Sequence, residues 1–307
     1  MTRGKKKYRA SGEEISYKMK STFGINPPPA EELCRKNGET TLEMIARLRK
    51  LGVHTPTKGM IKTPEQIEGC RAAGRVNSLV LDAVEREICV GMTTQEIDDI
   101  VMRETKALGG IPACLGYEGF PRAVCTSVND VVCHGIPSDK VVLRDGDIVN
   151  VDCTTIYGGY FGDASRMFMI GTPSHEAKRL VETVREAVAE TASHVRPYTY
   201  TLGDIGYDVN SICSRRGYSV VRDIGGHGVG LRMHEDPYVC HIGTPRTGLL
   251  FLPGMIFTIE PMVNEGREEF TVDRHDGWTV RTADGSLSAQ VEYEILVTED
   301  SYEILSK

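Results

Sequence analysis

Four carboxylates and one histidine form a candidate metal-ligand set, although they are spread over 140 positions of the chain. They are Asp152, Asp163, His227, Glu260 and Glu292. Oxygen and imidazole ligands of this kind favour Mn²⁺, Fe²⁺, Co²⁺ or Zn²⁺ over the thiolate-bound zinc of a structural finger. Four neighbouring carboxylates repel one another unless cations neutralise them, and two bridged cations can hold a hydroxide at neutral pH. The set therefore indicates a hydrolase.

The first two acids lie on a predicted β-hairpin. Residues 147–156 are rich in β-branched side chains and predict a buried strand, which a turn at residues 157–160 reverses. A two-residue turn at Tyr157-Gly158 would place Asp152 directly opposite Asp163, with Cβ atoms about 5 Å apart. Opposed like charges destabilise a plain hairpin but suit the binding of two cations. The alternative is a solvated hairpin with incidental acids.

The two glutamates are set in apolar strands. Glu260 ends the apolar run 255–260, where a carboxylate is costly unless it is paired or bound to a metal. Glu292 and Glu294 share one face of the predicted strand 288–297. Alternation by itself predicts that both of these side chains lie on the surface.

The histidine is flanked by glycines, at Gly225, Gly226 and Gly228. Glycines let the backbone approach a ligand closely. A single histidine is more often a hydrogen-bonded filler, but a second one at His234 favours a site for His227.

These residues lie in motifs that resemble the methionine aminopeptidases, in their shorter type I form. The matching stretches are residues 112–117, 125–129, 132–137, 146–152, 162–163, 226–237, 257–262, 276–280 and 288–292. They occur in the family's order, and the resemblance covers roughly residues 61–307. It implies the α+β pita-bread fold, in which two pseudo-symmetric halves share a curved antiparallel sheet covered by helices on one face.

The resemblance also implies two divalent metal ions, either Co, Mn, Fe or Zn, in the five-residue site. Asp152 would be bidentate to one metal, and Asp163 and Glu292 would bridge the two. A hydroxide between the metals would attack the carbonyl after the first residue of a peptide.

The implied catalytic residues are Glu260, His234 and His134. Glu260 would transfer the proton from the nucleophile to the leaving amine. His234 would stabilise the oxyanion, and His134 would hydrogen-bond the scissile amide. The alternative for both histidines is packing at the mouth of an apolar strand.

The implied substrate pocket holds an unbranched thioether side chain. Its residues are Cys114, Tyr117, Phe120, Met233 and Trp278, together with His134 and His234. Sulfur and aromatic faces suit a polarizable methionine, although Phe120 could equally be an ordinary core residue. Four residues depart from the family: Glu118 replaces a His or Asn and makes the rim more acidic, Met233 replaces an aromatic, and Phe161 and Tyr293 replace histidines.

The resemblance implies a metallo-exopeptidase that removes the initiator methionine of nascent chains when the second residue is small. The alternative is another pita-bread metallopeptidase, such as a prolidase or an aminopeptidase P-like enzyme. Those enzymes carry an N-terminal domain of well over 100 residues, which 60 residues cannot supply. A metal-free binding module would have lost ligands, and a structural metal site would not need His134 and His234.

Composition agrees with a folded, reduced protein. At 307 residues and 40% hydrophobic, the chain can bury a sizeable core. It has no run of about 18 apolar residues, and its basic start is not followed by a signal-peptide core. Nine cysteines without a C-x-x-C pair indicate free thiols. We therefore expect a cytoplasmic location.

The charge changes sign along the chain. Residues 1–60 contain 13 Lys or Arg and 6 Asp or Glu, whereas the remainder is acidic. We expect residues 1–60 to be a basic, proline-containing extension with a helix at 41–50, and residues 61–307 to be the catalytic domain. The extension would either touch the ribosome or serve as a solubilising leader. The family precedent is a monomer.

Two pairs of helices precede two sets of strands. Capping boxes open helices at Thr63 and Thr93, ending near Ile88 and Gly109. Further helices are predicted from 172 to 195 and from 201 to 216. This repeat predicts an internal duplication around a bent antiparallel sheet.

Overall fold

The structure is a computed structural model that describes residues 20–24 and 27–307. The helices are α3 (Ala30–Leu33), α4 (Thr41–Lys50), α5 (Pro64–Glu87), α6 (Thr94–Ala107), α7 (His175–His194) and α8 (Leu202–Arg215), with single turns η1 (Lys58–Met60) and η2 (Tyr117–Gly119). Residues 1–19 and 25–26, which include part of the predicted basic extension, lie outside the described residues.

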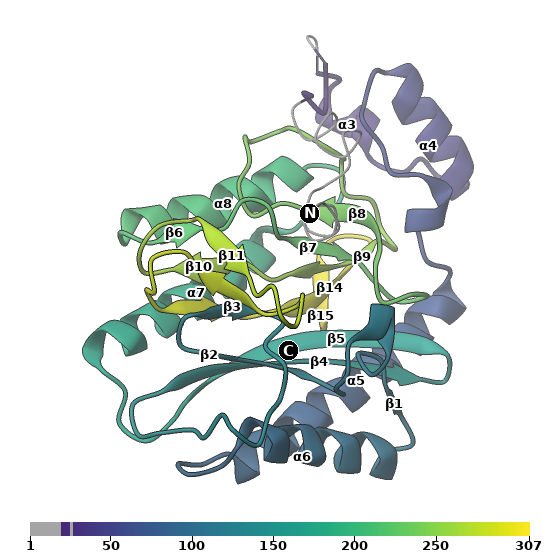
Figure 1. Ribbon diagram of the computed structural model, residues 1–307. Helices are drawn as coiled ribbons and strands as arrows, with labels where there is room; N and C mark the ends of the chain where they lie inside the picture. Colours follow the sequence, from purple (N-terminus) through teal and green to yellow (C-terminus); the bar gives the residue numbers. More distant parts are fainter. Residues whose placement is uncertain (1–19, 25–26) are drawn as a thin grey trace.

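The strands form four small antiparallel sheets (Figure 1). The first contains β1 (Ile111–Pro112), β2 (Cys125–Val128), β4 (Ile148–Tyr157) and β5 (Tyr160–Met169). The second contains β6 (Ser219–Val220), β10 (Met262–Asn264) and β13 (Ser288–Gln290), and the third contains β3 (Val131–Cys133), β11 (Phe270–Val272) and β12 (Val280–Thr282). The fourth contains β7 (Gly226–Gly228), β8 (Glu235–Val239), β9 (Ile256–Ile259), β14 (Tyr293–Val297) and β15 (Tyr302–Ser306).

The predicted helix starts are confirmed for α5, α6 and α8. Thr63 and Thr93 each occupy the N-cap position of a reciprocal capping box. Thr201 is the N-cap residue of α8, and its backbone N–H and hydroxyl both donate to the Asp204 carboxylate. The start predicted for α7 is wrong by three residues. That helix begins at His175 because the hydroxyl of Ser174 accepts the hydrogen bond of the first turn.

Each helix pair packs on its own set of strands. Helices α5 and α6 enclose one apolar cluster with β4 and β5, and α7 and α8 enclose a larger cluster with the strands of the second and fourth sheets. The two pairs lie in different parts of the molecule, with α6 at the bottom of Figure 1 and α8 at the upper left. The predicted succession of two helices and then strands, twice over, is therefore confirmed.

The β4–β5 hairpin has a different register from the predicted one. Tyr157 pairs with Tyr160, so the turn is Gly158-Gly159 and not Tyr157-Gly158. Asp163 is therefore opposite Thr154, and Asp152 is opposite Ser165. Because the shift is two residues, both aspartates remain on the same face of the hairpin, as diagonal neighbours.

Two segments that read as single strands are each divided between two sheets. The chain passes from β9 to β10 through Glu260, and from β13 to β14 through Glu292. In both cases the two strands belong to different sheets, the second and the fourth. Each glutamate therefore lies where the chain crosses from one sheet to the other.

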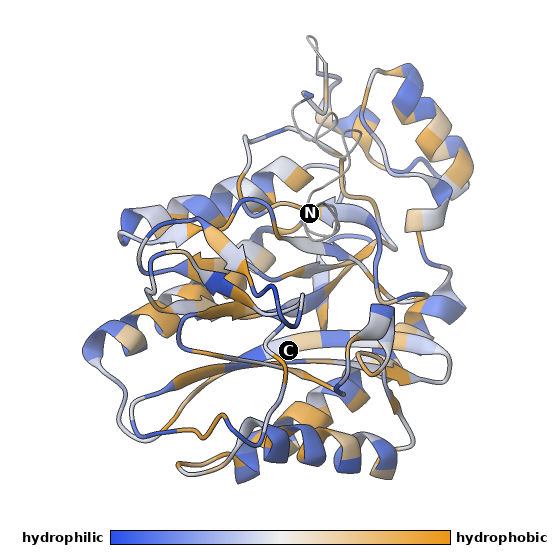
Figure 2. Ribbon diagram, viewed as in Figure 1, coloured by the Kyte–Doolittle hydropathy of each residue, from blue (hydrophilic) through white to orange (hydrophobic). Residues whose placement is uncertain are grey.

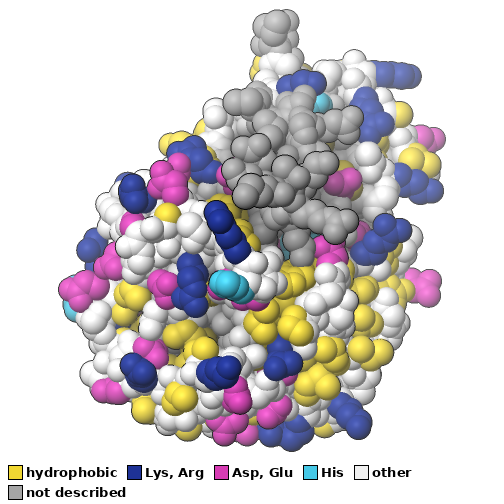
Figure 3. Space-filling view, viewed as in Figure 1, with side chains coloured by type: hydrophobic (Ala, Val, Ile, Leu, Met, Phe, Trp, Pro, Cys, Tyr) yellow, Lys and Arg dark blue, Asp and Glu magenta, His cyan; other side chains and the backbone are white. Residues whose placement is uncertain are grey.

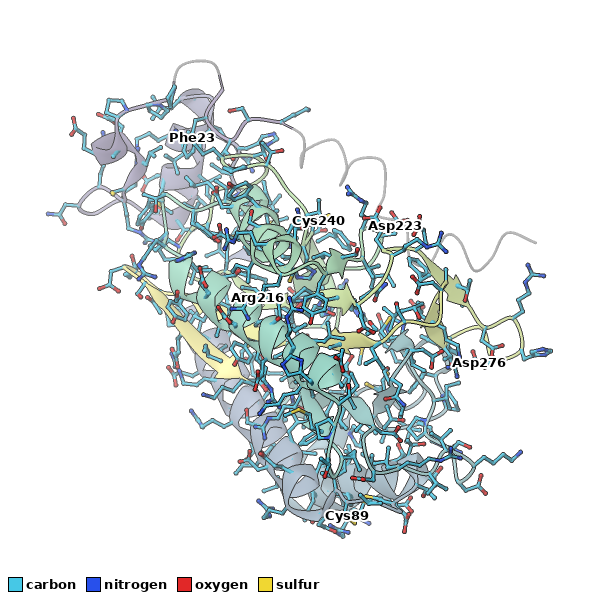
Figure 4. All side chains as sticks on the ribbon, turned by 90° about the vertical axis from the view of Figure 1, so that its left-hand side faces the viewer. Phe23, Cys89, Arg216, Asp223, Cys240 and Asp276 are labelled. Carbon is cyan, nitrogen blue, oxygen red and sulfur yellow. The ribbon has the colours of Figure 1, made fainter. Side chains whose placement is uncertain are left out.

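The described part of the N-terminal segment packs on the second half. Helix α4 matches the predicted helix at its two ends, and Thr40 and Glu43 form its capping box. Its buried side chains share an apolar cluster with Phe23, Tyr198 and Leu250. Phe23 and Cys89 mark opposite ends of the molecule in Figure 4, so this segment lies far from the α5–α6 turn.

The surface carries polar, charged and apolar side chains side by side. Blue and orange residues alternate along the outer helices in Figure 2, as expected for helices with one buried face. Basic, acidic and apolar side chains are interspersed over the face drawn in Figure 3. Among the described residues, no helix combines the length and apolar character that a membrane crossing requires.

Candidate functional site

The five predicted metal ligands come together in one cavity of about 730 Å³. Strands β4, β5 and β7 supply Asp152, Asp163 and His227. The two junctions between the second and fourth sheets supply Glu260 and Glu292. The cavity thus lies where three of the four sheets meet, and no single element could assemble it.

The hairpin acids are held by specific hydrogen bonds. The hydroxyl of Thr154 donates to Oδ1 of Asp163 at 2.9 Å. The backbone N–H of Asp163 donates to Oε2 of Glu294 at 3.0 Å. Asp152 shares their face of the sheet, diagonally from Asp163. Asp163 is therefore held by one hydrogen bond to its carboxylate and one from its backbone N–H.

The two junction glutamates are buried, with exposed fractions of 7% for Glu260 and 2% for Glu292. The hydroxyl of Thr258 donates to Oε1 of Glu260 at 2.7 Å, and the amide of Gln290 donates to Oε2 at 3.2 Å. Glu294 is also fully buried, at 0% exposed. The surface positions that simple alternation predicts for Glu292 and Glu294 are therefore wrong, because Glu292 stands where the chain crosses between the second and fourth sheets and Glu294 is covered by Asp163 of β5.

His227 presents an unprotonated nitrogen to the acids. Its Nδ1 lies 3.0 Å from the carbonyl oxygen of Gly228, which can only accept, so Nδ1 carries the proton. Burial lowers the pKa of His227 to about 3, so the ring is neutral. Its Nε2 lone pair then faces Oε1 of Glu260 at 3.4 Å and Oδ2 of Asp163 at 3.8 Å. A lone pair directed at carboxylate oxygens is repulsive unless a cation lies between them.

The four carboxylates are likewise unfavourable as bare anions. Burial raises the pKa of Asp152 to about 7. Burial and then the charge of Asp152 raise the pKa of Asp163 and Glu260. For Glu292 the causes are burial and then Asp163. Burial and neighbouring negative charge thus oppose ionisation within this cluster, as expected of carboxylates that share a cation.

The donor set fits a divalent metal. Donor atoms of Asp163, His227 and Glu292 lie within 4.8 Å of one another. Several carboxylates with one neutral imidazole match the ligand preferences of Mn²⁺, Fe²⁺, Co²⁺ and Zn²⁺. The hydrogen bond from Nδ1 to the Gly228 carbonyl is the support that a metal-bound histidine ordinarily has.

Two further predicted histidines border the cavity. The Nδ1 atom of His234 lies 2.7 Å from the Tyr117 hydroxyl, and its ring centroid lies 4.3 Å from that of His227. Although His234 is exposed at the cavity mouth, desolvation lowers its pKa, so it is neutral. His134 follows β3 and stands edge-on to Trp278, with ring centroids 6.0 Å apart.

The predicted pocket residues lie beside the metal ligands. Phe120 is only 3% exposed, yet it lines the cavity and meets Trp278 edge-on at 5.1 Å. Cys114 and Met233 belong to the same buried cluster, with Tyr117 packed against it. All seven predicted pocket residues therefore line one cavity with the five ligands.

Several residues that line the cavity were not predicted as site residues, among them Cys125, Ile224 and Met262. Cys125 lies in the matched stretch 125–129, so the motif itself was a signal for it. Glu118 also lines the cavity, with a left-handed φ of 46°. Asp223, on the segment that leads into β7, lies at the rim and is labelled in Figure 4.

Comparison with known proteins finds the same family throughout. A model of metallopeptidase family M24 matches residues 68–299. The methionine aminopeptidase of Escherichia coli (strain K12) is 45% identical over 250 residues, covering 80% of this chain and 93% of that protein. Methionine aminopeptidase A of Synechocystis sp. is 48% identical over 241 residues, covering 78% of this chain and 94% of that protein.

Solved structures of the same family are also similar to this chain. The methionine aminopeptidase of Rickettsia prowazekii has a TM-score of 0.78 at 43% identity, covering 80% of this chain and 99% of its own. A prolidase of Pyrococcus horikoshii has a TM-score of 0.64 at 21% identity, covering 89% of this chain and 73% of its own, a likeness that shows the shared fold alone. The chain therefore has the pita-bread fold and belongs to metallopeptidase family M24, among its methionine aminopeptidases.

Proposed function

We propose that the protein is a methionine aminopeptidase of the shorter type I form. It removes the initiator methionine of nascent chains when the second residue is small. The observation that carries the proposal is the neutral His227 nitrogen facing Glu260 and Asp163, inside a cavity that also holds a sulfur and aromatic pocket. The 33 positions between His227 and Glu260 support type I, because the type II enzymes have a long insertion there.

The proposed cofactor is a pair of divalent metal ions, with cobalt and manganese as the first metals to test. Asp152, Asp163, His227, Glu260 and Glu292 would hold them. Bound divalent cations supply Lewis acidity, which polarises a carbonyl and lowers the pKa of water. The raised pKa values of Asp163, Glu260 and Glu292 support a site in which bound cations would take the place of protons.

Glu260 has the proposed role of proton carrier between the attacking water and the leaving amine. Thr258 and Gln290 fix its two oxygens, so the carboxylate cannot turn away from the cavity. Burial raises its pKa, which favours uptake of the proton from the water.

His234 has the proposed role of oxyanion donor. Burial is the main cause of the raised pKa of Tyr117, so the phenol keeps its proton at neutral pH. When this hydroxyl donates to Nδ1 of His234, Nε2 must carry the ring proton and can donate to a developing oxyanion. His134, on the opposite side beside Trp278, would hydrogen-bond the scissile amide.

The first side chain of the peptide would enter the pocket formed by Cys114, Tyr117, Phe120, Met233 and Trp278. Sulfur atoms and ring faces match the polarizable thioether of methionine. Met233 in place of an aromatic makes one wall adaptable, and Glu118 adds negative charge to the rim.

The remaining proposals concern the whole chain. Residues 61–307 would be the catalytic domain, which the family match over 68–299 supports, and residues 1–60 the extension. All nine cysteines are free thiols, which supports a reducing, cytoplasmic location. The excess of Lys and Arg in residues 1–60 supports contact with the ribosome. We propose a monomer on family precedent.

The test is a panel of Met-X-peptides with X increasing from Gly and Ala to Val and Leu. Metal-free protein is assayed with Mn²⁺, Co²⁺, Fe²⁺ and Zn²⁺ in turn. We expect hydrolysis to require metal and to fall steeply as X grows. Ala-Pro is the control substrate for a prolidase, since Met-Pro would suit both enzymes. Cleavage of Ala-Pro without cleavage of Met-Ala-peptides would overturn the proposal.

A further inference from the structure

A buried ion pair joins Glu235, which lines the cavity, to Lys62, which lies outside that lining. The ammonium of Lys62 pairs with Oε2 of Glu235. The Lys62 side chain is only 1% exposed. Removing an ion pair from water costs more free energy than apolar residues of similar volume would, so stability alone does not account for it. A role in positioning the chain beside the cavity would explain why the pair is there.

Glu235 uses its second oxygen to hold the chain that leads to the cavity. Its Oε1 accepts the backbone N–H of Leu231 at 2.6 Å and that of Arg232 at 2.8 Å. One oxygen of the Glu235 carboxylate thus binds the start of the loop 231–235, and the other oxygen pairs with Lys62. The loop and Lys62 are therefore joined through a single side chain.

Lys62 lies directly beneath this loop and is itself firmly anchored. Its backbone N–H donates to the carbonyl of Gly254 at 2.8 Å, just before α5 begins. A Cβ atom added at Gly230 would lie 3.2 Å from Cε of Lys62 and 2.7 Å from Sγ of Cys70. The backbone can pass this closely only because residue 230 is glycine.

The loop carries two site residues. Met233 is buried in the pocket wall, and His234 contacts both Tyr117 and the metal-ligand candidate His227. A displacement of about 1 Å in such a group is enough to cost a large part of its catalytic contribution. The position of His234 thus depends on the connection from Lys62 through Glu235.

We infer that Lys62 is a positioning residue for peptide hydrolysis: its ammonium, acting through Glu235, holds the 231–235 loop so that His234 reaches the reacting carbonyl. The inference rests on the proposed function, because hydrolysis of Met-peptides is its readout.

The decisive experiment is a double-mutant cycle between Lys62→Met and His234→Ala on a Met-Ala-peptide with saturating Mn²⁺. We expect Lys62→Met to lower kcat by about 10- to 100-fold in the wild-type background. In the His234→Ala background the same change should cost less than about 3-fold, because the group that it positions is gone. Equal losses in the two backgrounds would overturn the inference.

Arg71→Met is the matched control. Arg71 lies on α5, the helix that begins two residues after Lys62, and its ion pair with Glu303, at 2.7 and 2.8 Å, ties that helix to β15, outside the cavity lining. Its loss should lower the melting temperature and leave kcat within about 2-fold of wild type. A drop in kcat as large as that of Lys62→Met would show that α5 docking alone is responsible.

A second variant covers the case in which Lys62→Met fails to fold. Lys62→Met/Glu235→Met removes both charges, so the melting temperature should return toward that of wild type. We expect kcat to stay low, because Leu231 and Arg232 have lost their acceptor. Recovery of kcat together with the melting temperature would reduce Lys62 to a structural role. Wild-type protein that does not cleave Met-peptides with any metal would instead refute the proposed function itself.

Discussion

The Nε2 atom of His227 lies 3.4 Å from Oε1 of Glu260, and the imidazole is neutral with its proton on Nδ1. Two electron-rich atoms at this distance are stable when they share a metal ion, or a proton on the carboxyl, whose pKa burial raises. The contact is therefore not an ion pair of the protein with itself. It is one edge of the proposed metal site.

His234→Ala should separate chemistry from metal binding. His234 contacts Tyr117 and lies beside, but is not one of, the five ligand candidates. Loss of an oxyanion donor costs about 2–4 kcal/mol, so kcat should fall about 10²- to 10³-fold. Isothermal titration with Mn²⁺ should give an affinity within about 3-fold of wild type. A variant that loses metal would disprove the assigned role.

Asp163→Asn should do the reverse. The substitution keeps the size of the side chain and the hydrogen bond from Thr154 but removes a charge from the centre of the donor cluster. We expect metal content and activity to fall together. The check is metal analysis of dialysed protein alongside the peptide assay. Full metal loading in an inactive variant would contradict Asp163 as a ligand.

Tyr117→Phe should act through the tautomer of His234. The change keeps the ring in the pocket and removes the hydroxyl 2.7 Å from Nδ1. A hydrogen bond of this kind contributes about 0.5–1.5 kcal/mol, so kcat should fall about 3- to 10-fold with little change in KM. Steady-state kinetics on a Met-Ala-peptide measures both. A rise in KM alone would make Tyr117 a pocket wall and nothing more.

The stability of the metal-free protein should respond to Asp152→Asn in a pH-dependent way. Burial raises the pKa of Asp152 to about 7, above the value near 4 of an unfolded aspartate. Between these values the unfolded chain releases its proton more readily than the folded one. Ionisation therefore lowers the free energy of unfolding of the wild type as pH rises through this window, an effect that is absent below it.

The side chain introduced by Asp152→Asn cannot ionise. In EDTA, the free energy of unfolding of this variant should therefore rise relative to that of the wild type as pH increases from 4 to 7.5, by up to about 4 kcal/mol. Denaturant unfolding at several pH values measures the difference. Added Mn²⁺ should reverse the order at pH 7.5, because the cation binds the ionised wild type better. A difference that stays constant with pH would rule out a raised pKa at this residue.

Local chemistry predicted several elements well. Helices α5, α6 and α8 begin where threonine caps and their partners three residues later predict, because a capping box uses only neighbouring atoms. The hairpin register failed for an equally local reason. Gly158 and Gly159 both have positive φ, 59° and 86°, which a two-residue hairpin turn requires and which tyrosine resists. The shift of two residues preserved the shared face of Asp152 and Asp163.

The sequence by itself determined the donor types, their order and the family to which they belong, since those depend on residue identity alone. Only the tertiary structure decided that Glu260 and Glu292 stand at crossings between two sheets and that Glu294 is buried beneath Asp163. Likewise, Lys62 meets Glu235 across 173 positions of the chain. Burial and contact between distant segments arise from how whole sheets pack, and no periodicity within one strand records that packing.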